Sequence, residues 1–231
     1  MITILIALMI VGYLLGSVPV AYLVGRRKGI DMRRQGTRQV GAGNLWRMTS
    51  RRLGMLIGFW DCLKGALMVW LAWLVGLDTG QQLLVGLAVI VGHNWPVFLW
   101  FHGGRGIAAL LGVVVMLPIV NRISPWPSVI AVGSVALATL IFHTSAVAVL
   151  FGVASLPLTS WLLGEENAVP LTYFAIFLIV VIKRLTAQKS HEKREIGIGR
   201  LLLNRLLYDR DIADRRAWVG RKHIVKKEPT G

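Results

Sequence analysis

Seven apolar segments separated by short polar stretches dominate this chain of 231 residues. A helix needs about 20 apolar residues to cross the hydrocarbon core of a bilayer. Hydrophobic residues make up 55% of the chain and charged residues only 16%, whereas a soluble domain carries about 25% charged residues. We therefore expect an all-α, polytopic membrane helical bundle with about seven transmembrane helices. The expected spans are residues 3–25, 53–76, 82–101, 107–120, 127–142, 145–163 and 168–185. Because the fourth and fifth are short, six spans remain an alternative.

The basic residues are concentrated in two blocks. Nine of the 26 lysines and arginines fall within residues 26–52, and fourteen fall within residues 183–227. Basic loops are retained on the cytoplasmic side of a membrane, so seven spans place the N-terminus outside and both blocks inside. We expect a membrane domain over residues 1–185 and a basic cytoplasmic tail over residues 186–231. No basic residue precedes the apolar run in residues 1–25, so we expect an uncleaved first span rather than a signal peptide.

The net charge of +15 would suit nucleic acid binding, but its distribution argues otherwise. Each basic block adjoins an apolar segment, where it would meet the anionic headgroups of membrane lipids. Cys62 is the single cysteine, which excludes a disulfide framework and a cysteine zinc cluster. No G-x-G-x-x-G or Walker A pattern occurs in the sequence. We expect membrane lipids as partners, and neither nucleic acid nor a bound metal or nucleotide.

Residues 92–109, GHNWPVFLWFHGGRGIAA, form a glycine-rich turn between two apolar segments. Gly103, Gly104 and Gly106 precede a new helix, whose first backbone N–H groups have no partner within the helix. The helix dipole and Arg105 add positive charge at that end, which suits a phosphate group. The alternative is a tight turn between two membrane helices, with Arg105 acting only as a topology signal.

Residues 29–44, GIDMRRQGTRQVGAGN, carry side chains suited to a second anion-binding segment. Their glycines allow the backbone to fold back and present amides to a ligand. Thr37, Gln39 and Asn44 can hydrogen-bond such a ligand, and Arg38 and its basic neighbours attract it. The alternative is a solvated basic loop that contacts lipid headgroups.

Three ionisable residues lie inside apolar segments. Asp61 and Lys64 are three residues apart, which puts them on one face of a helix. If the third span continues to Phe101, His93 lies about 12 Å from the same membrane surface as Asp61. An ionisable group at that depth costs at least about 2–3 kcal/mol unless it is paired. The pattern predicts a polar pocket open to the cytoplasm, or else a structural ion pair beside a hydrogen-bonded histidine.

Other polar positions have simpler structural explanations. Pro96 cannot donate a backbone hydrogen bond to the Gly92 carbonyl and leaves that oxygen free. Ser17, which with Pro19 interrupts the first span, is more typical of a helix-packing residue than of a ligand. Ser145 is placed to cap the sixth span. The basic and apolar residues of the tail favour a helix lying on the membrane surface.

Four motifs in a fixed order resemble the acyl-phosphate-dependent glycerol-3-phosphate acyltransferases, the PlsY family of bacterial membrane enzymes. They are GSVPVAYLVGR from residue 16, VGAGN from residue 40, DCLKG from residue 61 and GHNWPVFLWFHGGRGIA from residue 92. The resemblance implies a seven-helix protein of the bacterial inner membrane with its site facing the cytoplasm. It implies acyl transfer from acyl phosphate to the 1-hydroxyl of sn-glycerol 3-phosphate, which yields lysophosphatidate, the first step of phospholipid synthesis. It implies neither a metal nor another cofactor.

The resemblance also implies a set of site residues. Catalytic roles are expected for His93, Lys64 and Arg105, with His93 more plausible as a structural or phosphate-orienting group than as a base. Substrate and phosphate binding are expected for Ser17, Thr37, Arg38, Asn44, Gly103, Gly104, Gly106, Ser145 and Arg184.

The chain departs from the family pattern at several positions. It has Thr37-Arg38-Gln39 where the family usually has Ser-Gly-Asn, and Leu178 and Val181 where the family has His and Asn. These departures motivate the alternative of a catalytically silent relative that binds acyl phosphate or lipid phosphate. A third alternative, an anion transporter, is disfavoured because the sequence contains no repeat with interrupted helices.

Overall fold

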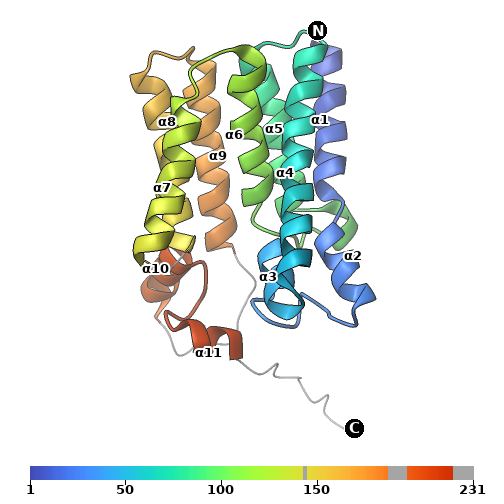
Figure 1. Ribbon diagram of the computed structural model, residues 1–231, viewed down its shortest axis with the longest axis vertical. Coiled ribbons are helices and arrows are strands. Elements are labelled where there is room, and N and C mark those ends of the chain that lie inside the picture. Colours follow the sequence, from blue (N-terminus) through green and yellow to red (C-terminus); the bar gives the residue numbers. More distant parts are fainter. Residues whose placement is uncertain (143–144, 187–196, 221–231) are drawn as a thin grey trace.

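The computed structural model describes residues 1–142, 145–186 and 197–220, and these residues form helices and no strand. Seven long helices run side by side along the long axis of the molecule (Figure 1). They are α1 (Ile2–Ser17), α4 (Arg51–Leu74), α5 (Thr79–Asn94), α6 (Ile107–Asn121), α7 (Trp126–Phe142), α8 (Ser145–Leu162) and α9 (Ala168–Leu185). The prediction of an all-helical bundle is confirmed, and five of the seven expected segments agree with a helix to within two residues at each end.

Length and composition divide these helices into two groups. The segments Ile2–Arg27, Arg51–Leu74, Thr79–Leu99 and Ala168–Leu185 are long and apolar enough to cross a membrane. Three shorter apolar helices, Ile107–Asn121, Trp126–Ile141 and Ala146–Leu162, lie beside them. The chain is therefore an integral membrane protein by composition, as expected.

The first expected span is broken at Pro19. A residue that precedes proline is pushed out of the helical region, and Val18 has φ −64° and ψ 110°. Consequently α1 ends at Ser17, and a separate helix, α2, runs over Val20–Arg27. The break turns the Val18 carbonyl away from the helix, and this oxygen accepts a hydrogen bond from Lys64 Nζ at 2.8 Å.

The third expected span, residues 82–101, is too long at its C-terminal end. Helix α5 stops at Asn94 because Pro96 forces Trp95 into a non-helical conformation, with φ −129° and ψ 67°. A single 3-10 turn, η1 (Val97–Leu99), follows. The Gly92 carbonyl, which Pro96 leaves free of the helix, accepts the Ser17 hydroxyl at 3.4 Å.

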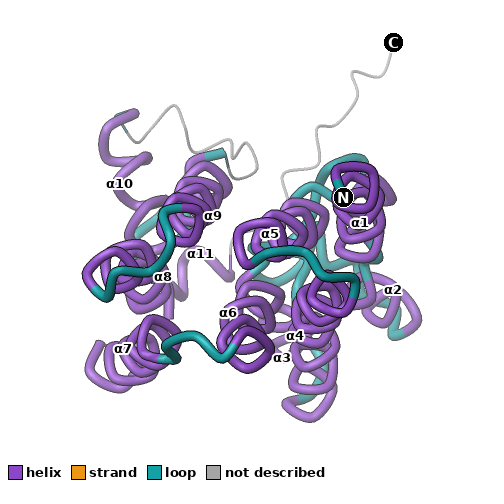
Figure 2. The backbone as a smooth tube through the Cα atoms, turned by 90° about the horizontal axis from the view of Figure 1, so that it is seen from above, coloured by secondary structure: helices purple, strands orange, loops and turns teal. Residues whose placement is uncertain are grey.

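Glycines allow close packing within two pairs of helices. A side chain at Gly16 would collide with the α5 backbone, and one at Gly92 would collide with the α1 backbone. Gly65 on α4 and Gly112 on α6 are in equally tight contact with the facing backbone. Small residues permit such approach between membrane helices. Seen from above, α1, α4, α5 and α6 form one group, and α7, α8 and α9 form a second (Figure 2).

The polar segments gather at the end of the bundle opposite the N-terminus (Figure 1). They include α2, the short helix α3 (Ala42–Met48), the turn over residues 95–106, and the tail helices α10 (Ile198–Tyr208) and α11 (Arg215–Gly220). Helix α10 packs against α8 and α9. Segments that are far apart in sequence therefore meet at one end of the molecule.

Candidate functional site

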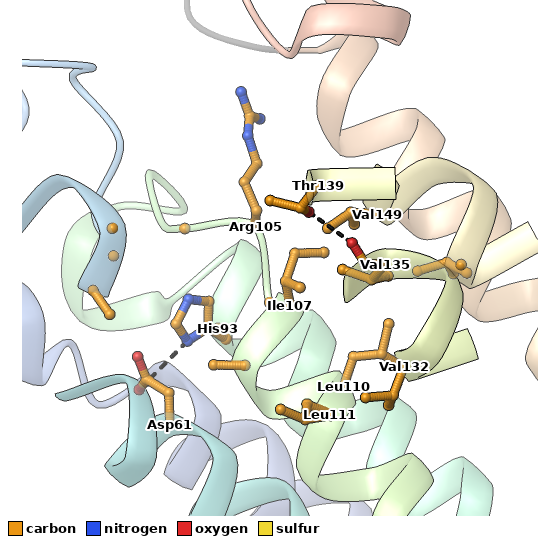
Figure 3. Close-up of a pocket in the computed structure, with 18 of the residues that line it drawn as sticks. Asp61, His93, Arg105, Ile107, Leu110, Leu111, Val132, Val135, Thr139 and Val149 are labelled. Atoms are coloured by element: carbon orange, nitrogen blue, oxygen red, sulfur yellow. Dashed lines mark hydrogen bonds and ion pairs between the residues drawn. The ribbon is translucent and has the colours of Figure 1, made fainter. Parts of the chain in front are cut away.

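Asp61, Lys64 and His93 form a buried polar cluster between α4 and α5. The Lys64 ammonium donates to Asp61 Oδ1 at 3.0 Å and to the Val18 carbonyl at 2.8 Å. The His93 imidazole lies with Nδ1 3.7 Å from Asp61 Oδ1 (Figure 3). Both Asp61 and Lys64 are 2% exposed and form the ion pair of one alternative, while Asp61 and His93 also line a large cavity, as the other alternative required. The depth expected for His93 assumed that its helix continues to Phe101. That assumption was wrong, because α5 ends at Asn94.

The glycine turn packs directly on His93. The Gly104 N–H donates to the His93 carbonyl at 3.1 Å. A Cβ on Gly104 would collide with His93 Nε2 and lie 2.5 Å from the Val40 carbonyl, and one on Gly103 would meet the His93 carbonyl. Gly106 has φ +69°, a left-handed conformation that favours glycine, immediately before α6 begins at Ile107. These three glycines are therefore required by the shape of the turn.

Arg105 points away from His93, toward the tail (Figure 3). Its Nε donates to Asp209 Oδ2 at 3.0 Å, and its Nη2 lies 2.8 Å from Asp209 Oδ1 in an ion pair. Its Nη1 group donates to the Lys183 carbonyl at 2.6 Å. Gln39 donates to the same Asp209 carboxylate at 3.0 Å. The arginine expected to bind phosphate is thus held in a two-pronged contact with a carboxylate of its own chain.

Asn44 organises the first polar loop. Its side-chain oxygen accepts the Thr37 N–H at 2.9 Å, and its amide group donates to the carbonyls of Met32, Gln35 and Gln39 at 3.1–3.3 Å. The side chain is 3% exposed. This geometry gives Asn44 a structural task within the loop. By contrast, the buried Thr37 hydroxyl has no hydrogen-bond partner among the described residues.

The last span contributes two buried cations. Arg184 donates to the carbonyls of Leu206 and Ala146, each at 2.7 Å, and so ties α9 to α10 and α8. Lys183 donates to the Asn94 carbonyl, and its ammonium lies 4.9 Å from the centre of the Trp95 ring. The sequence analysis identified Arg184 but not Lys183, which reads in sequence as one more basic residue at the end of a span.

A cavity of about 780 Å³ opens between α6, α7 and α8. Its walls are apolar, with Leu110, Val132 and Val135 on the sides (Figure 3) and Val114, Ala131 and Leu156 farthest from the polar end of the bundle. Its polar end is lined by Gln39, Asn44, Arg47, Asp61, His93, Gly104, Arg105 and Gly106. We call it the apolar cavity.

A second cavity, of about 830 Å³, adjoins the first. Its lining includes Thr37, Tyr208, Asp209 and four arginines, Arg47, Arg105, Arg184 and Arg210. We call it the basic cavity. The two cavities share seven lining residues, which are Gln39, Gly43, Arg47, Arg105, Ile107, Thr139 and Val149. The two spaces therefore meet at Arg105.

The expected site residues do not all line the same space. Thr37, Arg105 and Arg184 line the basic cavity, while His93, Asn44, Gly104 and Gly106 line the apolar cavity. Ser17, Gly103, Gly104 and His93 line a third space of about 10 Å³ beside Asp61, which is room for about one water molecule. Lys64 and Arg38 line none of these three spaces in the described structure. Ser145 begins α8, and its side chain lies outside the described residues.

Asp209 and Lys183 were missed by the sequence analysis. Asp209 lies 104 residues from Arg105 in sequence, within a tail whose mixture of acids and bases gave no signal of a specific contact. Gln39 was considered only as a general hydrogen-bonding residue of the first loop.

Comparison with known proteins gives consistent results. Residues 6–193 match the family described as glycerol-3-phosphate acyltransferase. The glycerol-3-phosphate acyltransferase 5 of Dehalococcoides mccartyi is 40% identical over 96% of each chain. The glycerol-3-phosphate acyltransferase of Endomicrobium trichonymphae is 34% identical over 80% of this chain and 94% of its own.

Two solved structures share the fold. The glycerol 3-phosphate form of PlsY, an integral membrane glycerol 3-phosphate acyltransferase, superposes with a TM-score of 0.72 at 29% identity, covering 87% of this chain and 93% of its own. The lysophosphatidic acid form superposes with a TM-score of 0.70 at 27% identity, covering 89% and 97%.

Proposed function

This chain belongs to the glycerol-3-phosphate acyltransferase family and is an acyltransferase, and we propose that it acylates the 1-hydroxyl of sn-glycerol 3-phosphate with an acyl phosphate as donor. The product is lysophosphatidate, and the step begins phospholipid synthesis. The reaction needs no metal and no other cofactor, because the acyl phosphate is already activated.

The meeting of an apolar and a basic cavity at Arg105 carries this proposal. An acyl phosphate has a long hydrocarbon chain and a charged head, so it requires both environments side by side. The apolar cavity between α6, α7 and α8 suits the chain, and Arg105 at its polar end suits the phosphate. The basic cavity, with four arginines, suits the phosphate of glycerol 3-phosphate.

The reaction then depends mainly on position. The 1-hydroxyl oxygen attacks the acyl carbonyl carbon, the bond from that carbon to the phosphate oxygen breaks, and inorganic phosphate leaves with the hydroxyl proton. Holding the two substrates in line supplies much of the rate. Arg105 and the backbone N–H groups at the start of α6 are placed to stabilise the developing negative charge.

His93 has a positioning role in this scheme. Its carbonyl accepts the Gly104 N–H, and its ring fills the space beside Gly104. The neighbouring Asp61 carboxylate is already bound to Lys64 at 3.0 Å. We therefore assign the Asp61, Lys64 and His93 cluster to holding the glycine turn against α4 and α5, and assign the proton to the leaving phosphate.

We further propose that all seven long helices cross the inner membrane of a bacterium, with the N-terminus outside and the site facing the cytoplasm. The common end shared by the first loop, the glycine turn and α10 supports this arrangement (Figure 1). The positive-inside rule assigns that end, which carries the first basic block and the described residues of the second, to the cytoplasm.

An acyl-transfer assay tests the proposal. Purified protein in detergent is given radiolabelled glycerol 3-phosphate with palmitoyl phosphate as the donor. A parallel reaction contains palmitoyl-CoA in place of palmitoyl phosphate. We expect lysophosphatidate from palmitoyl phosphate alone. Arg105→Ala should lower kcat about 10²- to 10³-fold, as removal of a single oxyanion donor does. The matched control is Arg52→Ala, an exposed arginine of α4 that lines neither described cavity.

Absence of product while another family member is active in the same assay would refute the proposed acyl-transfer activity. Saturable binding of acyl phosphate without turnover, lost in Arg105→Ala, would instead identify a catalytically silent relative. Product formed from palmitoyl-CoA would refute the proposed donor and leave the acceptor intact.

A further inference from the structure

The carboxylate of Asp209, in the C-terminal tail, is bound to the guanidinium of Arg105. Asp209 accepts a hydrogen bond from Arg105 Nε at 3.0 Å and forms an ion pair with Nη2 at 2.8 Å, and Gln39 donates to the same carboxylate. The two side chains are only 17% and 16% exposed. Such a paired contact uses the face of the guanidinium that best fits a carboxylate or a phosphate. While Asp209 is bound, an anionic ligand therefore lacks the preferred donors of Arg105.

The backbone at Asp209 does not require an aspartate. Asp209 follows the last residue of α10 with φ 57° and ψ 35°, and its N–H donates to the Arg205 carbonyl. Glycine is the usual residue at this left-handed position, and asparagine is also accepted there. Either would close the helix without a negative charge. The charge at position 209 is thus explained by Arg105 and not by the fold of α10.

Neighbouring contacts keep the carboxylate close to Arg105. Arg205 binds Asp211 Oδ1 at 2.5 Å and the Leu185 carbonyl at 2.8 Å. Arg184 holds the Leu206 carbonyl. These contacts anchor residues on both sides of Asp209 to the end of α9. An anchored group acts as an intramolecular ligand with a high effective concentration.

We propose that Asp209 is an internal competitor for Arg105, which the phosphate of a substrate must displace. The inference rests on the proposed function, which assigns the basic cavity, lined by Arg105 and Asp209, to the phosphate of glycerol 3-phosphate. It also makes Asp209 a residue that sets substrate affinity rather than a catalytic residue. The segment lies beyond residues 6–193, the part that matches the family model.

The expected effect follows from the population of the open state. Apparent affinity falls in proportion to the fraction of molecules in which the site is free. If Asp209 occupies Arg105 nine-tenths of the time, removing its charge tightens phosphate binding about tenfold, which corresponds to about 1.4 kcal/mol.

The test compares Asp209→Asn and Asp209→Gly with the wild-type chain. Both substitutions suit the left-handed conformation, so α10 should retain its end. Asp214→Asn is the matched control, because it removes one negative charge from the same tail, and asparagine preserves the cap on the Ala217 N–H. Dissociation constants for inorganic phosphate and glycerol 3-phosphate are measured by calorimetry on the full chain in detergent. Thermal unfolding verifies that each variant is folded.

We expect both Asp209 variants to bind inorganic phosphate and glycerol 3-phosphate about tenfold more tightly, and Asp214→Asn to match the wild type within about twofold. The gain should vanish when Arg105→Ala is added. KM for glycerol 3-phosphate should fall by a similar factor.

Equal or weaker phosphate binding by folded Asp209 variants, including no binding by any chain, would overturn the competition. It would mean that Asp209 orients Arg105 or only stabilises the tail. The proposed function is judged separately, by lysophosphatidate formed by the wild-type chain. A wild-type chain without turnover whose Asp209 variants bind phosphate more tightly would refute the proposed function and support the competition.

Discussion

At Lys64, a single side chain joins α4 to the end of α1. Lys64 is 2% exposed, and its ammonium binds Asp61 on its own helix and the Val18 carbonyl where α1 ends. The spacing of three residues made the Asp61 contact predictable from the sequence. The Val18 contact was not predictable, because it requires both the break at Pro19 and the approach of α1 to α4. A local pattern identified the pair, and tertiary packing completed it.

Lys64→Met should destabilise the protein strongly. The substitution keeps the length of the side chain but leaves the Asp61 carboxylate buried without its partner, which costs about 3–5 kcal/mol in comparable pairs. Thermal unfolding in detergent measures the loss. Adding Asp61→Asn should restore much of the stability, because no buried charge then remains uncompensated. Lys28→Met, at an exposed lysine after α2, is the control, and an equal loss there would contradict the ion-pair argument.

Gly104→Ala should lower turnover through the position of the glycine turn. The added methyl group would meet His93 Nε2 and the Val40 carbonyl, so the turn that carries Arg105 must shift. A displacement of about 1 Å in a positioning group can cost about 10²-fold in rate. We expect kcat in the acyl-transfer assay to fall at least tenfold. Gly199→Ala, where nothing lies within 4 Å of the added methyl group, should leave kcat unchanged.

Among the helices, the apolar segments predicted where most helices lie, but they did not predict where a helix is interrupted. The expected span 168–185 coincides with α9, and 107–120 with α6 to within one residue. The errors fall at Pro19 and Pro96, where an apolar run continues but the backbone cannot. The sequence marked both prolines but not the new direction of the chain. The apolar cavity could not be predicted from the sequence. It depends on the distances between α6, α7 and α8, and no sequence motif determines those distances.

Ala131→Phe should shorten the acyl chain that the enzyme accepts. Ala131 on α7 lies at the end of the apolar cavity away from Arg105, with Val114 and Leu156. A phenyl ring there would fill the space required by the last carbons of a long chain. We expect kcat/KM for palmitoyl phosphate to fall about tenfold or more, with lauroyl phosphate nearly unaffected, since each buried methylene contributes about 0.8 kcal/mol.

The matched control is Val129→Phe, two residues away on α7 but half exposed and not part of the described cavity lining. Equal loss with both donors in Ala131→Phe, or the same change in Val129→Phe, would argue that the acyl chain lies elsewhere.

Across the whole molecule, the sequence predicted which segments gather at one end of the bundle better than it predicted the contacts of single residues. Thr37, Arg105 and Arg184 come from three distant segments and line one cavity, as the resemblance to the family led us to expect, but Lys64 does not line it. Asn44 and Lys64 belong to the same motifs but are engaged in hydrogen bonds within the protein. Motifs do not distinguish a residue that holds a ligand from one that holds the loop. That distinction depends on long-range contacts such as the one between Arg105 and Asp209.

The orientation of the bundle can be tested by labelling with a membrane-impermeant maleimide. In a Cys62→Ser background, Ser50→Cys precedes α4 at the basic end, and Ser124→Cys lies between the short helices α6 and α7. Ser50 accepts the Leu53 N–H at 3.3 Å and Ser124 accepts the Trp126 N–H at 3.4 Å, so each substitution should cost only about 1 kcal/mol and leave the protein folded. We expect intact cells to label position 124 at once and position 50 only after permeabilisation, because the positive-inside rule keeps the basic end in the cytoplasm.

Glu166→Cys, exposed in the loop before α9, reports on the same face as position 124 and should be labelled in intact cells. Labelling of position 166 but not of position 124 would mean that α6 and α7 do not cross the membrane, leaving fewer than seven spans. Labelling of position 50 in intact cells would reverse the orientation. The arginine-lined cavity would then face away from the cytoplasm, and a cytoplasmic supply of both phosphorylated substrates would be excluded.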